Sequence, residues 1–310
     1  MRAYSLVAPA KINLYLEIIG SRADGYHELA MVMQSVNLAD RLDLYANGTD
    51  AIRVHCDHPL VPSDQSNLAY RAAELMAKQF PDCFDKYGGV DITVDKQIPV
   101  GAGLAGGSTN AAAVLVGLDL MWELGLTQSE LQEIGAKLGS DVPFCIAGGT
   151  AIATGRGEKI SPLPDLDHLV AVLGKHRSLS VSTPWAYQTY RQQFGHTYAS
   201  LTHQAHRVQS GAMVTAIAHK DSQAIGQHLS NDLEKVVLPA YPQVAHLREQ
   251  MQQLSPIGAM MSGSGPTVFG LADSTAAAAE LRSRIRGQIS DPDVEFWTAP
   301  FTATGIRVVS

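Results

Sequence analysis

Apolar and polar residues alternate in several stretches of the chain, which is the pattern of a strand that buries one face. Within residues 89–99, for example, Val90, Ile92 and Val94 alternate with polar positions. The same pattern, with glycine and proline as punctuation, predicts strands at 3–19, 28–47, 169–174, 257–272, 293–298 and 305–309, and a strand pair around tight glycine turns at 145–160. Strand-forming segments therefore occur near both ends of the chain.

Other segments repeat apolar residues at a spacing of three or four positions, which predicts helices with one buried face. Residues 111–122 show this repeat directly after a glycine-rich segment. The other predicted helices are 66–79 with Ser66 as its cap, one that opens at Thr127 or Ser129 and stops at Gly139, and several rich in Ala, Gln and His around 184–253.

Length and composition indicate a globular protein of two domains. The chain has 310 residues, whereas single hydrophobic cores stop growing at about 250–300 residues. Hydrophobic residues make up 45% of it and charged residues 17%, as in ordinary globular proteins. The proline-rich segment 161–168 is the predicted boundary, which gives an N-terminal domain at 1–160 and a C-terminal domain at 161–310.

Charge and cysteine content argue against several classes of partner. The net charge is −7 without a long basic run, so neither nucleic acid nor a membrane is an expected partner. The three cysteines form no CxxC pair, and the H-x-x-H pairs at 55–58 and 203–206 have no obvious third ligand except Cys56 or Asp57, so no zinc site is expected. The first residues do not resemble a signal or transit peptide, and no apolar run reaches the roughly 18 residues that span a membrane. We expect a cytoplasmic protein, monomeric or weakly dimeric, that acts on a small molecule.

Four glycines fall within Pro99–Ala112, between the strand at 89–99 and the helix that follows it. Their spacing fits two phosphate-binding patterns only in part. Gly101-x-Gly103-x-x-Gly106 matches the dinucleotide fingerprint, but no acidic residue on a second strand follows at the required distance. The P-loop pattern also fails, because Gly107 stands where that motif requires lysine.

The position of this glycine segment is more informative than its spacing. It leads into a helix N-terminus, where unpaired N–H groups and the positive end of the helix dipole favour an anion. Ser108 or Thr109 is expected to cap that helix. The alternative is a turn without a ligand, but a mere connection would not need four glycines, each of which costs backbone entropy on folding. We therefore expect a phosphate cradle of backbone N–H groups, with its positive side chain supplied from elsewhere.

Three more segments carry candidate chemistry, and each has a structural alternative. Lys11 and Asn13 in "PAKINLYLEI" share one face of a strand, unless Lys11 simply faces water on an edge strand. Asp141 in "LGSDVPF" is placed either in a site or as a helix cap or Asx-turn. The turn 263–266 in "MMSGSGPTVFGL" is either a hairpin or a second anion-binding nest.

Taken in this order, the Lys11 strand, the glycine segment and the late Gly-Ser-Gly turn resemble the defining motifs of the GHMP kinase superfamily. The resemblance spans positions 9–267. It implies an ATP-dependent kinase of a small molecule, with Mg²⁺ as a further cofactor. It also implies an α+β fold with an N-terminal domain like ribosomal protein S5 domain 2, a ferredoxin-like C-terminal domain, and an active site between them.

The resemblance implies a role for each motif residue. Asp141 would accept or orient the proton of the substrate hydroxyl, while Lys11 would stabilise the developing alkoxide and favour the charged form of Asp141. Ser108 is the one expected protein ligand of Mg²⁺. The residues expected to bind ATP are those of the glycine segment and two on the adenine side: Asn67, Lys96, Pro99, Val100, Gly101, Ala102, Gly103, Leu104, Ala105, Gly106, Gly107, Ser108 and Thr109.

Two positions of the glycine segment depart from the family pattern. Ala105 stands where many members have glycine, and alanine is tolerated there only if the backbone φ is below zero. Thr109 stands where many members have serine, and it keeps the hydroxyl. The sequence leaves open whether Ala105 alters the affinity for ATP.

Four further segments resemble one branch of the superfamily, which phosphorylates the 2-hydroxyl of a cytidine diphosphate-linked methylerythritol in the non-mevalonate isoprenoid pathway. They are "RADGYHEL" (22–29), "SNLAYRAA" (66–73), "GSDVPF" (139–144) and "SNDLE" (230–234). This resemblance implies that Tyr26 and Tyr187 stack on the cytosine, that His27 reads its edge, and that Asn13 also contacts the substrate. Packing of Tyr187 in the core is the alternative.

Two other functions are compatible with these motifs. One is a GHMP kinase for another acceptor, such as homoserine or mevalonate. The other is a non-catalytic, ligand-binding relative of these kinases. The presence of both Lys11 and Asp141 disfavours the second, since a binding protein has no use for a base paired with a cation.

Overall fold

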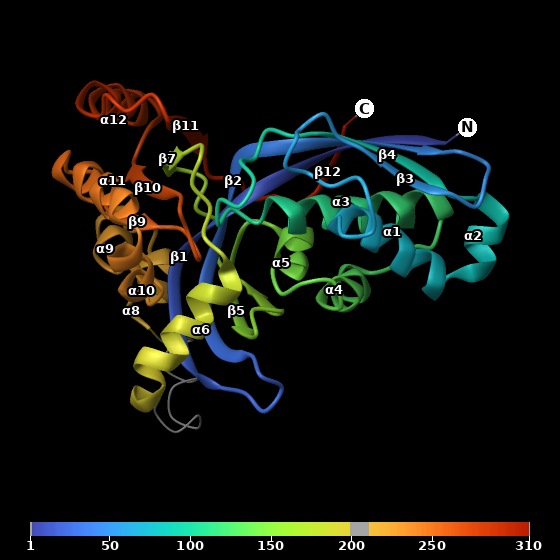
Figure 1. The fold of residues 1–310 in the computed structure, drawn as a ribbon, viewed down its shortest axis with the longest axis horizontal. Helices are drawn as coiled ribbons and strands as arrows, with labels where there is room; N and C mark the ends of the chain where they lie inside the picture. The colour runs from blue at the N-terminus through green and yellow to red at the C-terminus, as the bar shows by residue number, and fades with distance from the viewer. Residues whose placement is uncertain (1, 199–210, 310) are drawn as a thin grey trace.

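The protein, described here from a computed structural model over residues 2–198 and 211–309, contains two β-sheets flanked by helices. In Figure 1 the helices of the N-terminal half lie on the right and those of the C-terminal half on the left. The residues left out include the His203–His206 pair and part of the span that was predicted to be helical around 184–253.

The larger sheet is built on a long antiparallel hairpin of β1 (Ala3–Ser21) and β2 (His27–Ala46). The order β12-β1-β2-β4-β3 forms its main path, and β5, β6 and β8 join beside it. The bounds of these other strands are Ile52–His55 (β3), Val90–Asp95 (β4), Thr150–Gly155 (β5), Lys159–Pro162 (β6), Ser230–Asn231 (β8) and Arg307–Val309 (β12). The predicted strands at 3–19 and 28–47 are confirmed, and the one predicted at 89–99 is confirmed only over Val90–Asp95.

The hairpin is irregular where the first candidate motif lies. Pro9 pairs with Ala39, but the next residue, Ala10, pairs with Val36, so residues 37–38 of β2 bulge out of the ladder. A bulge bends the strand and changes where the neighbouring side chains point. Lys11 and Asp40 lie on the two strands close to this bulge.

The helix that follows the glycine segment, α3 (Gly106–Trp122), packs against β1 and β2 and is the centre of the N-terminal half. The other helices here are α1 (Leu68–Gln79), α2 (Pro81–Tyr87), α4 (Gln128–Ala136) and α5 (Val142–Ala147). Thr127 caps α4 in a capping box with Glu130. Of the two predicted starts of this helix, Thr127 and Ser129, the first is therefore confirmed. The strand predicted from residue 145 is wrong at its start, because residues 145–147 belong to α5 and β5 begins only at Thr150.

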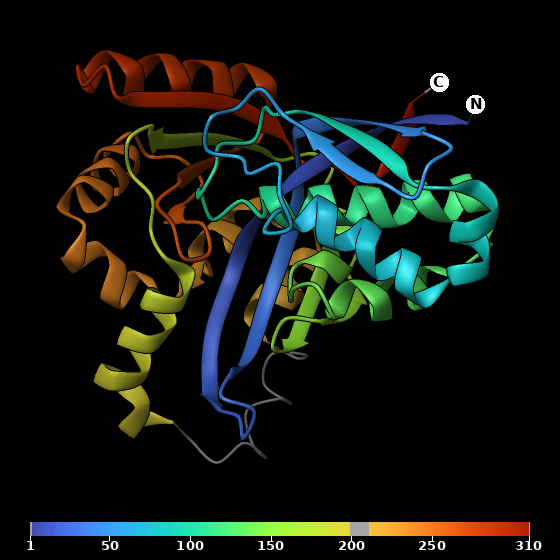
Figure 2. The same cartoon turned by 45° about the vertical axis from the view of Figure 1, so that its right-hand side comes forward.

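The smaller sheet has the antiparallel order β11-β7-β10-β9. Its strands are β7 (Val170–His176), β9 (Ala259–Met261), β10 (Val268–Ala272) and β11 (Val294–Pro300). The helices of this half are α6 (Thr183–Phe194), α8 (Ala212–Ala218), α9 (Ser222–Gln227), α10 (Glu234–Ala240), α11 (Pro242–Gln253) and α12 (Thr275–Gln288), with a short 3₁₀ helix at 195–197. Figure 2 shows α12 lying along β11, so the apolar faces of α11 and α12 cover this sheet as the α+β class requires.

The two halves of the chain are interleaved rather than strictly consecutive. β8 and β12 come from the C-terminal half but pair with β1 in the larger sheet. The predicted boundary at residue 161 falls inside β6. Within the ranges described, no helix has both the length and the apolar character needed to cross a membrane.

Candidate active site

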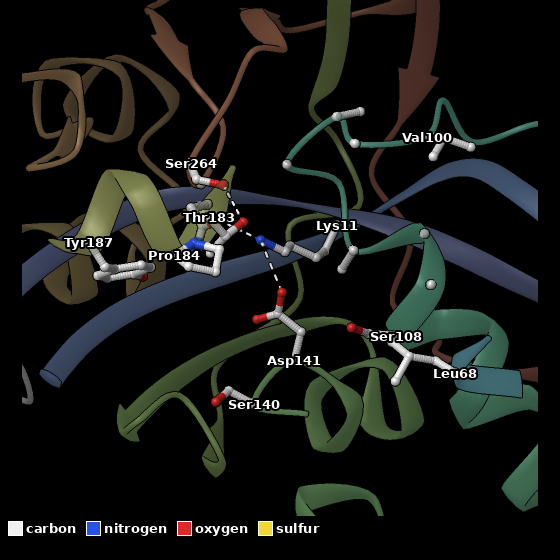
Figure 3. A pocket seen from close by; sticks show the side chains of 18 of the residues that line it. Lys11, Leu68, Val100, Ser108, Ser140, Asp141, Thr183, Pro184, Tyr187 and Ser264 are labelled. Atoms are coloured by element: carbon white, nitrogen blue, oxygen red, sulfur yellow. Dashed lines mark hydrogen bonds and ion pairs between the residues drawn. The ribbon is translucent and has the colours of Figure 1, made fainter. Parts of the chain in front are cut away.

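A cavity of about 950 Å³ brings the candidate motifs together. Its walls come from β1 and β2, the start of α1, the glycine segment, residues 140–141, the first turns of α6 and the turn at 263–264. In Figure 3, Lys11 and Asp141 lie between Tyr187 on one side and Ser108 on the other. The cavity therefore has two arms, one on the side of Ser108 and one on the side of Tyr187, which meet at the Lys11–Asp141 pair.

The Lys11 side chain is almost fully buried, and its ammonium is held by two partners. Nζ donates a hydrogen bond to Asn13 Oδ1 at 2.7 Å and lies 3.7 Å from Asp141 Oδ2. The Lys11 backbone N–H also donates to the Leu104 carbonyl at 3.2 Å, which ties β1 to the glycine segment. The alternative of an edge lysine that faces water does not fit this burial.

Asp141 occupies the position before α5, but its carboxylate makes no capping hydrogen bond to that helix. Its side chain is 31% exposed and points toward Lys11 in the cavity. Asp141 therefore stands at the N-cap position of α5 without capping the helix through its side chain. A partly exposed carboxylate beside a fixed ammonium is an arrangement in which a base can accept a proton from a bound hydroxyl.

The glycine segment turns sharply before it enters α3. Gly101 and Gly103 have φ of +62° and +75°, a region that favours glycine. A Cβ on Gly103 would overlap the carbonyl oxygen of Ser262, so the segment also runs close to the turn at 263–264. The first N–H groups of α3, from Gly106 to Ser108, are free of helical partners and line the cavity, as a phosphate cradle requires.

The start of α3 differs from the prediction. The helix begins at Gly106 and its N-cap residue is Ala105, so neither Ser108 nor Thr109 is the cap. Ala105 has φ of 58° in the left-handed region and caps without a side-chain hydrogen bond. The condition under which alanine would be tolerated at this position, a φ below zero, is not met. Ala105 therefore carries backbone strain at the edge of the cavity.

Two residues of the predicted ATP-binding set do not reach the cavity. Leu104 is 1% exposed and packs in the core, while its carbonyl accepts the bond from Lys11. Thr109 is fully buried, and its N–H already donates to the Ala105 carbonyl at 2.9 Å. The other predicted members of the set line the cavity: Asn67, Lys96, Pro99, Val100, Gly101, Ala102, Gly103, Ala105, Gly106, Gly107 and Ser108.

Asn67 lines the cavity but also caps a helix. Its Oδ1 accepts from the Ala69 N–H at 2.8 Å, and its Nδ2 donates to the Pro62 carbonyl at 2.6 Å. The predicted cap, Ser66, instead donates to Asp64. One Nδ2 hydrogen and a second lone pair of Oδ1 are what Asn67 retains for a ligand.

The opposite arm of the cavity carries the aromatic residues. Tyr26 is 53% exposed, and the Arg156 guanidinium lies 4.9 Å from the centre of its ring. The rings of His27 and Tyr187 have centroids 5.3 Å apart. Tyr187 also packs against a core cluster to which both halves of the chain contribute, so it takes part in the core and in the cavity wall at once. All the predicted substrate residues, Asn13 included, line the cavity.

His27 is kept neutral by its surroundings. Burial, followed by the nearby charge of Arg191, lowers the pKa of His27 to about 4. Arg191 Nε lies 3.4 Å from His27 Nε2, and its Nη2 donates to the Gly25 carbonyl. Because Arg191 can only donate, His27 Nε2 is the acceptor in this pair and Nδ1 carries the proton.

Among the described lining residues, four are cations and one is a carboxylate: Lys11, Lys96, Arg156, Arg191 and Asp141. The chain as a whole has a net charge of −7, so the cavity has the opposite sign of charge from the protein as a whole. Clefts of one sign concentrate ligands of the opposite sign. The cavity is therefore suited to a ligand, or a pair of ligands, with several negative charges.

Sequence reasoning missed several residues of this site. Arg191 lies one helical turn after Tyr187 on α6, a spacing that could have indicated it. Arg156 lies in the turn between β5 and β6 and gave no signal of its own. Thr183 and Ser264 share a hydrogen bond of 2.8 Å beside Lys11, which brings α6 and the late Gly-Ser-Gly turn together (Figure 3).

Comparison with known proteins agrees with this arrangement. The descriptions "GHMP kinases N terminal domain" and "GHMP kinases C terminal" match residues 67–149 and 213–291. The 4-diphosphocytidyl-2-C-methyl-D-erythritol kinase of Nostoc punctiforme is 65% identical, with 100% of this chain and 99% of the relative covered. The chain belongs to the GHMP kinase family. A protein of the same name from Trichodesmium erythraeum is 61% identical, with 99% of each chain covered.

Solved structures of GHMP kinases have the same fold. The crystal structure of a 4-(cytidine 5'-diphospho)-2C-methyl-D-erythritol kinase aligns with a TM-score of 0.72 at 32% identity, over 96% of this chain and 99% of the other. A homoserine kinase from Cytophaga hutchinsonii aligns with a TM-score of 0.77 at 18% identity, over 100% and 98%. The second similarity concerns the fold alone. Membership of this kinase family implies that ATP is the phosphoryl donor.

Proposed function

We propose that the protein transfers the γ-phosphoryl group of ATP to the 2-hydroxyl of 4-diphosphocytidyl-2-C-methyl-D-erythritol. The observation that carries this proposal is the position of the Lys11–Asp141 pair, 3.7 Å apart, between the N-terminus of α3 and the aromatic arm of the cavity. The relatives at 58–65% identity bear the name of the enzyme for this acceptor, and almost their whole length is covered.

Each arm of the cavity has a role in this reaction. The free N–H groups at the start of α3 and the turns of the glycine segment hold the phosphates of ATP. Tyr26, His27 and Tyr187 hold the cytosine, and the neutral His27 offers its Nδ1–H to an acceptor atom of the base. Arg156 and Arg191 add positive charge on the side where the diphosphate of the acceptor would lie.

The chemical step is assigned to the central pair. Asp141 takes the proton of the acceptor hydroxyl as its oxygen forms a bond to the γ-phosphorus, and the bond from that phosphorus to ADP breaks. Lys11 stays protonated and offsets the negative charge on the attacking oxygen. Asn13 keeps the Lys11 ammonium in place through the 2.7 Å hydrogen bond.

Magnesium fits the cavity as an ion held mainly by phosphate and water. Asp141 and the Ser108 hydroxyl are two of the lining groups that could each supply one oxygen ligand. Within the described ranges, no three His, Cys, Asp or Glu side chains form a cluster that could hold a metal by themselves. The ion would neutralise charge on the phosphates of ATP.

A panel of acceptors tests the proposal. The protein is incubated with γ-labelled ATP and, in separate reactions, with 4-diphosphocytidyl-2-C-methyl-D-erythritol, homoserine or mevalonate. The mass of each product is then measured by mass spectrometry. Addition of one phosphoryl group to the cytidine-bearing acceptor, with no transfer to the others, is the expected result. Transfer to homoserine or mevalonate instead would overturn it, and transfer to none would favour a non-catalytic relative.

A further inference from the structure

Asp40, on β2, is a fully buried carboxylate that does not line the cavity. Its Oδ1 accepts hydrogen bonds from the backbone N–H groups of Gln97 and Ile98, each at 2.8 Å. Its Oδ2 accepts from Lys96 Nζ at 2.5 Å and from Asn110 Nδ2 at 2.8 Å. The whole acceptor capacity of a carboxylate is thus used by four donors.

These donors lie at the two ends of the glycine segment. Gln97 and Ile98 directly precede it, and Asn110 lies near its other end, in the first turns of α3. The Lys96 ammonium lies beside the start of α3, because a Cβ on Gly106 would come within 2.9 Å of its Nζ. A single side chain therefore joins both ends of the loop that faces the phosphates.

The Asp40 carboxylate also favours the charged form of Lys96. Burial lowers the pKa of this lysine, and the charge of Asp40 and its hydrogen bond to Nζ oppose that decrease. Without Asp40, the ammonium would be buried with no carboxylate partner that the described contacts supply.

We propose that Asp40 is a positioning residue for ATP. It joins the two ends of the glycine segment through hydrogen bonds and holds Lys96 in place in the cavity wall. In this arrangement the N–H groups of the loop are ordered before ATP arrives, so that binding does not have to order them. The inference rests on the proposed binding of ATP in this cavity. The competing interpretation is that Asp40 contributes to the stability of the fold and to nothing else.

Asp40→Asn separates the two interpretations, because the amide oxygen can keep the two backbone bonds while the amide NH₂ faces Lys96 and Asn110. We expect the Kd for a non-hydrolysable ATP analogue to rise about tenfold or more, the effect of losing a hydrogen bond to a charged group. The KM for ATP should rise with it, while the KM for the acceptor stays within about twofold of wild type. Hydrogen–deuterium exchange of residues 97–110 without ATP should become faster.

Asp119→Ala is the matched control, since Asp119 is a buried carboxylate in the last turn of the same helix and accepts from the Leu126 N–H at 2.9 Å. It should lower the free energy of unfolding without changing the Kd for the analogue. If Asp40→Asn also loses only stability, and binds the analogue as the wild type does, the inference is overturned.

A second variant covers the case in which Asp40→Asn does not fold. The double variant Asp40→Asn with Lys96→Met removes the unpaired buried charge, and it is compared with Lys96→Met alone. The double variant should bind the analogue more weakly than the single variant, since Asn110 has also lost its acceptor. Equal affinity of the double and the single variant for the analogue would overturn the inference. Failure of the wild type itself to bind the analogue would instead count against the proposed function.

Discussion

Lys11 and Asp141 form an ion pair at 3.7 Å in which the cation is fixed and the carboxylate is not. The Lys11 side chain is 5% exposed and is anchored by Asn13, whereas that of Asp141 is 31% exposed and makes no capping bond to α5. A base must reach the proton that it takes, and a cation that stabilises a developing charge must not move. The pair has both properties.

The first prediction concerns Asp141→Asn. The exchange keeps the shape of the side chain and removes no capping bond, so the fold should be retained. Turnover should fall by roughly 100-fold or more, the scale of one acid–base contribution, while the affinity for ATP stays nearly unchanged. Steady-state kinetics with calorimetric ATP-analogue binding checks both parts. A variant that keeps more than about a tenth of the wild-type rate would show that Asp141 is not the base.

The second prediction concerns Tyr187, whose ring lies against His27 in the aromatic arm. Tyr187→Ala should weaken acceptor binding by about 1–3 kcal/mol, the contribution of stacking on one base, and leave the KM for ATP unchanged. Tyr187→Phe is the matched control because it keeps the ring, and it should bind the acceptor nearly as well as wild type.

Because Tyr187 also packs in the core, the free energy of unfolding of both variants must be measured by urea titration. A rise in the KM for ATP instead of the acceptor would assign Tyr187 to the other arm. Loss of the folded state in Tyr187→Ala, with normal acceptor kinetics in a milder Tyr187→Leu, would make it a core residue only.

Local patterns in the sequence predicted the parts of the site that depend on neighbouring residues. The alternation around Val90–Val94, the glycines after it and the apolar repeat of α3 are each a property of one short segment, so the strand, loop and helix could be read in order. The Lys11 strand and Asp141 were identified as candidates because their motifs are short and ordered along the chain.

What the sequence could not show depends on geometry across strands or on close competition between neighbours. Ser66 and Asn67 are both good caps, and the structure selects Asn67 because its Oδ1 reaches the Ala69 N–H. Ala105 takes the cap position because the turn through Gly101 and Gly103 places it there. Asp40 meets its partners only after the hairpin and β4 have formed, so nothing local to it signals a role.

The third prediction concerns the protonation of His27, whose pKa is lowered to about 4 by burial and by Arg191. A lowered histidine pKa means that the folded protein resists protonation. The contribution to the free energy of unfolding is therefore fully present above about 6.5, the ordinary value, and is lost as the pH falls toward 4. Acceptor binding should be constant from neutral pH down to about pH 5, because the ring stays neutral there.

NMR titration of the His27 ring protons, assigned with a His27→Gln variant, measures this directly. Arg191→Met should raise the pKa of His27 only part of the way to its ordinary value, since burial is the larger cause. A His27 that titrates near 6.5 in the wild type would contradict both the neutral state and the assignment of Nδ1–H as a donor to the base.

The last prediction concerns Ala105, which holds a left-handed conformation at φ 58° directly before α3. That conformation costs an L-residue about 1–2 kcal/mol, whereas glycine adopts it freely. The exchange of alanine for glycine also lowers the free energy of unfolding by about 0.4–1 kcal/mol, because the unfolded chain becomes more flexible. Ala105→Gly should therefore stabilise the protein by roughly 0.5–1 kcal/mol in urea unfolding. Ala102→Gly, at a loop position without positive φ, is the control and should destabilise it. Because the cradle N–H groups belong to residues 106–108, the Kd for an ATP analogue should change less than about twofold in Ala105→Gly. A loss of stability equal to that of Ala102→Gly would show that the strained cap is not present in solution.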